Sequence, residues 1–439
     1  MTDASTSEIM SPGLLKVVER AKTEPEGRFH SLAHLIDVPA LMRAYQRMRK
    51  DAAVGVDGVT KEQYGQDLEG NLRGLHERLV SKRYRHQPIR RVHIPKDKGK
   101  TRPIGISAFE DKLVQDAVRE VLEAIYEQDF LDCSHGFRPR RRAHDAVRAL
   151  DRIAHQGKVS WILEADIVSF FDSLDRAKLK ELLQLRVADG SLLRLIGKCL
   201  HVGVLDGADY SEPDTGTAQG SVLSPMLGNV YLHYVLDLWF EHEVKPRLRG
   251  EAHLVRYADD FVMTFELQDD AERVMDVLVK RMGRFGLTLH PEKTRLLPFR
   301  RPPAAQTGGK APATFDFLGF TLHWRRGRSG RWGMTCKTRH ARLRRAVQTI
   351  ADWCRRHRHQ PVKAQHAALT RRIQGHFNYF GVSGNSRSLR LIIEQAKRVW
   401  YKWLRRRSQQ AHLNWTRFRE MLKRFPLPRP RILVRIWGS

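Results

Sequence analysis

A short apolar segment in the middle of the chain is interrupted by two adjacent acids. Residues 253–265 form two apolar runs that are separated by Ala258-Asp259-Asp260, which is the pattern of a β-hairpin with an acidic tip. Upstream, residues 159–167 form an apolar strand that ends near Asp166. If these strands are neighbours in one sheet, three carboxylates meet at one edge of it.

Such an edge suits two Mg²⁺ ions. Hard divalent cations take oxygen ligands, and the two ions of phosphoryl-transfer sites lie about 3.5–4 Å apart. Each acid also has a plainer explanation. Aspartate is common in hairpin turns, and an acid at the end of a strand, such as Asp166, often caps the helix that follows.

The chain is strongly basic. Its 439 residues include 78 Lys and Arg against 49 Asp and Glu, which gives a net charge of +29. We therefore expect a polyanionic partner, and nucleic acid before a membrane surface. Charge alone does not separate a binding protein from an enzyme, because neutralising phosphates provides affinity without chemistry.

Composition excludes several other classes of protein. With 41% hydrophobic residues the chain can build cores, so wholesale disorder is excluded. No apolar run is long enough to cross a bilayer, and the first 13 residues lack the apolar core of a signal peptide, so we expect a cytoplasmic protein. The four cysteines form no Cys-x-x-Cys pair, which argues against a zinc module.

Strand and helix patterns are mixed without regular alternation, which predicts an α+β fold. Strands are predicted over residues 89–94 and 102–106, on either side of a turn rich in Gly and Lys, and a helix over 110–126. Residues 301–312 are rich in Pro and Gly and mark a linker or loop. Beyond them we expect a helical, Arg-rich region with three amphipathic helices.

Short motifs also follow one another in a defined order. Tyr257-Ala258-Asp259-Asp260 and residues 166–172 resemble the two acidic motifs of reverse transcriptases. More specifically, the chain resembles the reverse transcriptase/maturases of bacterial group II introns and their stand-alone group II-like relatives. The other segments that carry this resemblance are residues 56–60, 90–96, 101–106, 134–139, 143–146, 216–229, 286–293, 317–320 and 375–380.

The resemblance implies a right-hand polymerase with an antiparallel palm sheet, followed by an α-helical thumb or maturase domain X. The expected parts are an N-terminal helical extension (1–82), fingers and palm (83–313), a thumb-like helical region (314–425) and a tail (426–439). We expect a form without the endonuclease that many family members carry.

The resemblance also implies the site residues. Asp166, Asp259 and Asp260 would be the catalytic carboxylates and would bind two Mg²⁺ ions, with the Ile167 carbonyl as a backbone ligand. The residues expected to contact the incoming nucleotide are Lys96, Arg102, Phe171, Gln219 and Lys293.

Each of these nucleotide-site residues has an implied role. Lys96 and Arg102 would grip the triphosphate, and Phe171 would be the steric gate that favours dNTPs over rNTPs. Gln219 would touch the nucleotide or template, and Lys293 would lie near the triphosphate and assist proton transfer to pyrophosphate. The alternatives are solvated cations for Lys96, Arg102 and Lys293, and core packing for Phe171.

The implied activity is RNA-directed DNA synthesis from a DNA primer on an RNA template with dNTPs. A second hypothesis is an RNA-binding maturase that folds a group II intron for splicing; both roles coexist in the family. A third is a stand-alone polymerase in phage defence or DNA repair. A retron enzyme is disfavoured by the length and the domain X-like motif, and an RNA-templated RNA polymerase by Phe171. The sequence indicates no oligomeric state.

Overall fold

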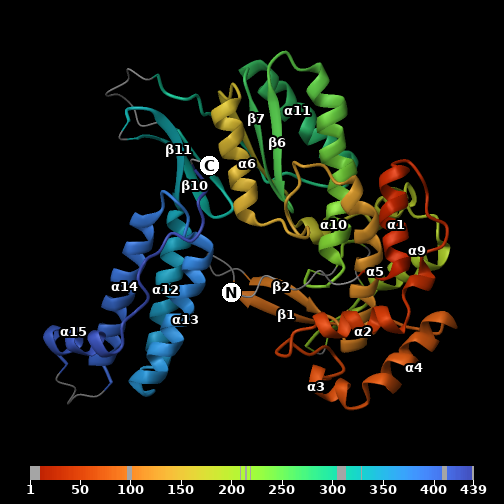
Figure 1. Cartoon of the computed structure of the whole chain (residues 1–439), viewed down its shortest axis with the longest axis horizontal. Helices are drawn as coiled ribbons and strands as arrows, with labels where there is room; N and C mark the ends of the chain where they lie inside the picture. Colours follow the sequence, from red (N-terminus) through yellow and green to blue (C-terminus); the bar gives the residue numbers. More distant parts are fainter. Residues whose placement is uncertain are drawn as a thin grey trace.

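The computed structural model describes residues 10–95, 101–207, 209–212, 215–217, 219–303, 313–327, 329–407 and 413–437. Figure 1 shows a body of helices and sheets and, beside it, a bundle of helices. The main α-helices are α1 (Pro12–Thr23), α2 (Val38–Arg47), α3 (Lys61–Tyr64), α4 (Leu68–Val80), α5 (Phe109–Asp129), α6 (Ala143–Gln156), α7 (Phe170–Ser173), α8 (Arg176–Gln184), α9 (Gly190–Leu200), α10 (Ser224–Leu232), α11 (Gln268–Arg284), α12 (His340–Arg356), α13 (Val362–Phe380), α14 (Ser386–Arg405) and α15 (Trp415–Arg424). No helix in these ranges is both long and apolar enough to cross a membrane.

The strands form three sheets. They are β1 (Ile89–Pro95), β2 (Thr101–Ile106), β3 (Trp161–Asp166), β4 (Val204–Asp206), β5 (Asp209–Ser211), β6 (Ala252–Tyr257), β7 (Asp260–Phe265), β8 (Arg295–Pro298), β9 (Thr314–Phe317), β10 (Phe320–Arg326) and β11 (Trp332–Thr338). The sheet orders are β2-β1-β4-β5, β6-β7-β3-β8 and β11-β10-β9. The predicted α+β class is confirmed, and so are the hairpin of 253–265 and the strand that ends at Asp166.

The central sheet, β6-β7-β3-β8, is antiparallel throughout and is covered on both faces. Side chains alternate along each strand, so Ile162 and Val262 face one apolar cluster with α6 and β9–β11. Leu163 and Phe261 face the other cluster, which holds α10 and α11. Because both faces are buried, the register of the strands is strongly specified.

The N-terminal helices belong to the same core as the central sheet. α1 and α2 pack against α5, which is buried along most of its 21 residues, and one apolar cluster runs from Leu14 to Leu289. The last part of the expected N-terminal helical extension consists of α3 and α4, which are separated by a 3₁₀ turn. The expected domain limits stay predictions.

The β1–β2 hairpin lies in the lower half of the body in Figure 1 and points sideways toward the side of the C-terminal helices. Its strands pair from Arg90 opposite Ile106 to Pro95 opposite Thr101, and β4 extends the sheet in parallel with β1. Both predicted strands of this hairpin are confirmed, whereas Lys96, in the turn between them, lies outside the described residues.

The region after residue 313 does not begin as a helix, and that prediction was wrong. Residues 314–338 form β9, β10 and β11, because Phe315, Phe317, Phe320, Leu322 and Trp324 place large apolar side chains on one buried face. The helical periodicity begins only at α12. A fourth helix, α15, joins the three that were expected.

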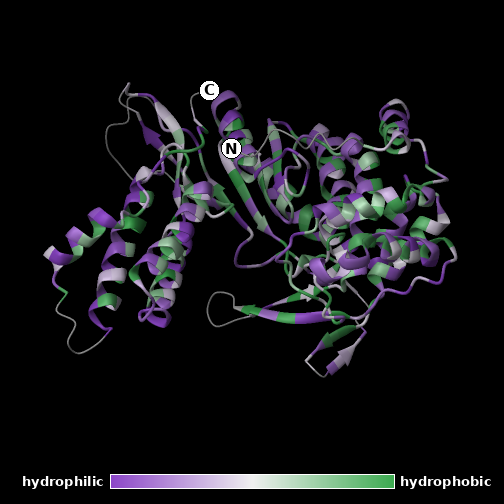
Figure 2. Cartoon of the chain, turned by 60° about the horizontal axis from the view of Figure 1, so that its bottom comes forward, coloured by the Kyte–Doolittle hydropathy of each residue, from purple (hydrophilic) through white to green (hydrophobic). Residues whose placement is uncertain are grey.

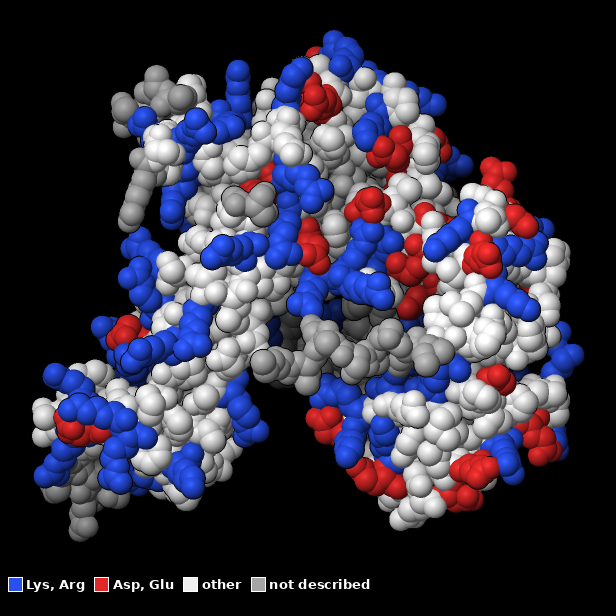
Figure 3. All heavy atoms as spheres, in the orientation of Figure 1, with Lys and Arg blue, Asp and Glu red and all other residues white. Residues whose placement is uncertain are grey.

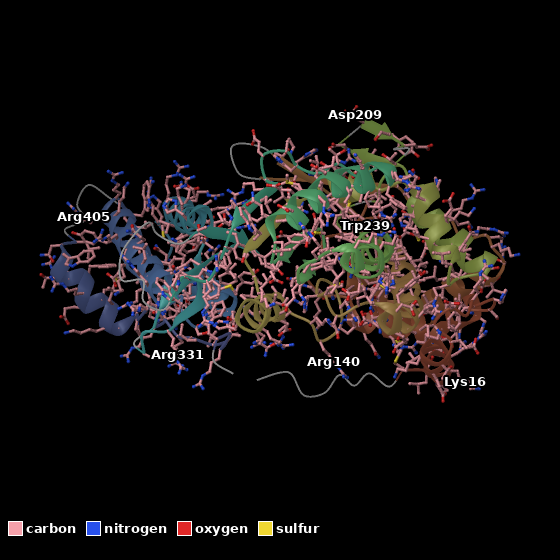
Figure 4. The ribbon with its side chains drawn as sticks, turned by 90° about the horizontal axis from the view of Figure 1, so that it is seen from above. Lys16, Arg140, Asp209, Trp239, Arg331 and Arg405 are labelled. Atoms are coloured by element: carbon pink, nitrogen blue, oxygen red, sulfur yellow. The ribbon has the colours of Figure 1, made fainter. Side chains whose placement is uncertain are left out.

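The helices α12–α15 form a C-terminal bundle with an apolar core of its own, and hydrophobic and hydrophilic residues alternate along them in Figure 2. Trp400 is completely buried in this core. Seen from above, Arg405 of the bundle and Lys16 of the N-terminal helix lie near opposite ends of the molecule (Figure 4).

Candidate active site

Two neighbouring strands of the central sheet carry two of the acids. Asp166 is the last residue of β3 and Asp260 the first of β7, and they lie directly opposite each other in the antiparallel ladder. Residues that are opposite in a ladder point to the same face of the sheet. Asp259 occupies the two-residue turn between β6 and β7. The structure therefore brings together the three acids that the sequence analysis selected.

The backbone around Asp166 is tied to a distant segment. The carbonyl of Asp166 accepts a hydrogen bond from the His290 N–H at 2.8 Å. Ile167 pairs with Leu289 in an isolated antiparallel bridge, and its side chain is buried. These contacts fix the strand end while leaving the role of the Ile167 carbonyl a prediction.

Burial and neighbouring charges raise the pKa of two of the acids. Burial raises the pKa of Asp260 to about 7, and the charges of Asp259 and Asp166 add to the shift. The pKa of Asp259 is also raised, first by burial and then by the charge of Asp166, while Arg102 and Arg256 oppose this shift. Both shifts have the same two causes, the loss of water around a buried carboxylate and the repulsion between neighbouring negative charges.

We expect Asp260→Asn to stabilise the metal-free protein. Between the model-peptide value of 3.8 and the folded value of about 7, the folded state binds the proton more tightly than the unfolded state. The contribution of Asp260 to the free energy of unfolding therefore falls as the pH rises through this window. At pH 8 the amide should raise the melting temperature by about 2–4 °C, and at pH 5, where only about a third of the window has been crossed, the increase should be clearly smaller.

Thermal melts in EDTA at both pH values measure this effect. The matched control is Asp209→Asn, since Asp209 is exposed on β5, and its melting temperature should match the wild type at either pH. A lower melting temperature for Asp260→Asn at pH 8 would contradict the expected sign.

Lys293 contacts the acidic cluster directly. Its ammonium lies 2.5 Å from Asp166 Oδ2, and both side chains are partly exposed. In the structure this lysine therefore supplies a positive charge to the Asp166 carboxylate. Its expected place beside a triphosphate stays a prediction.

The donors fit a divalent cation. Within the described ranges, no group of three or more His, Cys, Asp or Glu side chains stands ready as a metal site. The chemistry of Asp166, Asp259 and Asp260 nevertheless suits a hard cation, because carboxylate oxygens are its preferred ligands. The positively charged ammonium of Lys293 already lies against the Asp166 carboxylate, as a cation would.

The structure also places three further predicted residues. Arg102 is exposed on β2, and its charge reaches Asp259, whose pKa it lowers. Phe171, in α7, is partly buried and packs against Phe170 with ring centroids 5.2 Å apart. The Gln219 carbonyl accepts a hydrogen bond from the Gly105 N–H of β2 at 2.7 Å, which joins its segment to the β1–β2 hairpin.

The sequence analysis missed two groups that support the acids. The Leu318 N–H, in the turn between β9 and β10, donates to the Asp260 carboxylate, and the Tyr379 hydroxyl of α13 donates to the Leu318 carbonyl at 2.9 Å. Arg256 of β6 donates to the Ala258 carbonyl at 3.0 Å. A lone arginine inside an apolar strand was the only sequence signal for the second group.

Comparison with known proteins identifies the family. Residues 94–322 match the family described as "Reverse transcriptase (RNA-dependent DNA polymerase)". Protein YkfC of Escherichia coli is 30% identical over 362 residues, which are 73% of this chain and 90% of that protein. Group II intron-encoded protein LtrA of Lactococcus lactis is 35% identical over 265 residues. The chain belongs to the group II intron reverse transcriptase/maturase family.

Proteins similar to this chain also occur outside bacteria. Nuclear intron maturase 1 of Arabidopsis thaliana is 34% identical over 106 residues, which are 24% of this chain and 15% of that protein. The match to LtrA covers 58% of this chain but only 42% of LtrA. The chain therefore spans less than half the length of that group II intron relative.

Proposed function

We propose that the protein is an RNA-directed DNA polymerase that extends a DNA primer on an RNA template with dNTPs. The observation that carries the proposal is the convergence of Asp166 and Asp260, opposite each other in the central sheet, with Asp259 in the adjoining turn. In this proposal the β1–β2 hairpin is the fingers, the central sheet the palm and α12–α15 the thumb or maturase domain X, and the protein acts in the bacterial cytoplasm.

Asp166, Asp259 and Asp260, with the Ile167 carbonyl, would hold two Mg²⁺ ions. When bound, these ions would lower the pKa of the primer 3′-hydroxyl and neutralise charge on the transferring phosphate. Arg102 would bind phosphate oxygens of the nucleotide through its charged donors, together with Lys96. Gln219 would contact the nucleotide or template, and Lys293 would leave Asp166 for the triphosphate.

Purified protein tests the proposal directly. With Mg²⁺ and dTTP it should extend oligo(dT) on poly(rA), and EDTA should stop the extension. A folded protein that gives no extension in this assay would overturn the proposed function.

We expect Phe171→Ala to relax discrimination between sugars. In the proposal, the Phe171 ring fills the space that a ribose 2′-hydroxyl would need, so its removal should raise the efficiency of UTP relative to dTTP by about tenfold or more, an effect of about 1.4 kcal/mol. Single-nucleotide incorporation with each substrate measures the ratio, and the dTTP rate of the same variant serves as the control. An unchanged ratio would assign the ring to core packing instead.

A second candidate function is that of a maturase that binds intron RNA. The charge distribution favours it, since Lys and Arg side chains cover the C-terminal bundle and the adjoining front of the molecule, whereas Asp and Glu gather mainly on the body (Figure 3). Splicing that survives Asp259→Ala but fails after replacement of Arg344 and Arg355, both exposed on α12, would support this role.

A further inference from the structure

Arg256 is completely buried beside the acidic turn, and every one of its side-chain donors has an acceptor. Nε and Nη2 donate to the two Asp237 carboxylate oxygens at 2.7 and 2.5 Å. Nη1 donates to Asn229 Oδ1 and to the Ala258 carbonyl, both at 3.0 Å, and Nη2 also donates to Ser134 Oγ at 2.8 Å. A guanidinium carries five N–H donors, so this one is fully satisfied.

The acceptors come from three separate parts of the chain. Asn229 lies in α10 and Asp237 in its π-helical continuation, whereas Ser134 lies in the loop before α6. Asn229 also donates to the Gly136 carbonyl of that loop at 2.7 Å. The loop and β6 exchange two more backbone bonds, which connect Arg256 to Cys133 and His135, both at 2.8 Å. Helix, loop and hairpin are thus joined through one side chain.

The bond to Ala258 acts on the residue before a catalytic acid. Ala258 has a φ of 58°, a left-handed conformation that costs a non-glycine residue free energy and persists only where its surroundings hold it. The Arg256 guanidinium restrains this conformation by donating a hydrogen bond to the Ala258 carbonyl. Asp259 follows directly, so the direction of its carboxylate depends on this turn.

Stability alone does not account for the arginine. A buried ion pair contributes little net stability compared with apolar residues of similar volume, because both charges lose their hydration. The ion pair instead fixes the positions of the groups around it. The planar guanidinium makes two bonds to the carboxylate and three further bonds, and these five bonds permit a single arrangement of its partners.

We propose that Arg256 is a positioning residue of the polymerase reaction, which fixes the Ala258 carbonyl and thereby the direction of the Asp259 carboxylate. The proposal rests on the proposed polymerase function. It predicts that weakening the Arg256 contacts lowers the rate of nucleotide addition and the affinity for divalent metal, and leaves the binding of template and primer unchanged.

The test compares Arg256→Lys with Arg186→Lys in the full chain. Arg186 is a matched control: it is buried, it binds both Asp129 oxygens at 2.8 and 3.1 Å, and it donates to the Glu24 and Gly27 carbonyls. Its partners lie just after α1 and at the end of α5 and include none of the three acids. Both variants should melt at lower temperatures than the wild type by similar amounts.

The two variants should differ in catalysis. At a temperature well below both melting points, Arg256→Lys should lower kcat by about tenfold or more, since small misplacements of reacting groups have effects of up to about a hundredfold. The KM for dTTP and the affinity for template–primer should change less than about twofold. Mn²⁺ binding, followed by electron paramagnetic resonance, should weaken at least about threefold in Arg256→Lys, an effect of about 0.7 kcal/mol, and stay at the wild-type value in Arg186→Lys.

Equal loss of kcat in the two variants would overturn the proposal. If Arg256→Lys fails to fold, Asn229→Ala takes its place, because it removes one guanidinium bond and the Gly136 bond but leaves the Asp237 pair intact; wild-type kcat and Mn²⁺ affinity in that variant would also overturn it. A wild type that binds Mn²⁺ but does not extend primers would instead refute the polymerase function, and the Mn²⁺ comparison would still decide the role of Arg256.

Discussion

Asp259→Ala should lower primer extension by at least about a thousandfold. The change removes a carboxylate from the acidic cluster, and losing the charge stabilisation that this carboxylate helps to provide corresponds to about 4 kcal/mol in the barrier. Folding should not suffer, because burial and the charge of Asp166 already raise the pKa of Asp259 and make its ionised form unfavourable in the metal-free protein.

Extension of oligo(dT) on poly(rA) measures the loss, with Asp209→Ala as the matched control. Asp209 is exposed on β5 (Figure 4), far along the chain from the three acids, and its variant should keep the wild-type rate. Comparable rates for Asp259→Ala and the wild type would refute the assignment of the acids to catalysis.

Gly136→Ala should reduce extension by about ten- to a hundredfold. A Cβ atom at this position would lie 2.8 Å from the Tyr257 carbonyl carbon and closer still to the Ala258 nitrogen, so the loop and the acidic turn would be forced apart. Both contacts are backbone atoms and cannot rotate away. A displacement of the turn by a few tenths of an ångström moves Asp259, and reaction rates are sensitive to such shifts.

Gly74→Ala is the control for this substitution. Gly74 lies in α4, and a Cβ there would meet nothing within 4 Å; alanine in a helix interior should stabilise the protein by about 0.5–1 kcal/mol. Rate measurements below the melting temperatures of both variants separate the two cases. A wild-type rate for Gly136→Ala would show that the turn does not depend on its contact with the loop.

The sequence predicted the acidic strands because their signals are local. The apolar runs around Ala258-Asp259-Asp260 and before Asp166 have the period and length of strands, and the structure places both in the central sheet. The motifs around them then placed the chain in the correct family.

The supporting contacts were not predictable in the same way. Arg256 bonds to Ser134, which is 122 positions away, and Tyr379 reaches Leu318 across 61 positions. No periodicity or spacing in the chain records such pairs, because they form only when separate elements pack. The strands β9–β11 were missed for a different reason. The region is rich in arginine and its later part has helical periodicity, and this signal was extended to residues 314–338, where the large apolar residues alternate as in strands.

The distribution of the cores has a consequence for how the protein is made. The core of the body joins Leu14 to Leu289, so the N-terminal helices emerge from the ribosome long before the strands and helices that bury them. Contacts so distant in the chain form slowly and leave apolar surface open in the meantime. The C-terminal bundle closes its core between Leu343 and Leu427, within a single short stretch of synthesis. During translation the nascent body is therefore the part that leaves apolar surface open for longer, whereas the bundle needs only a short stretch of chain to close its core.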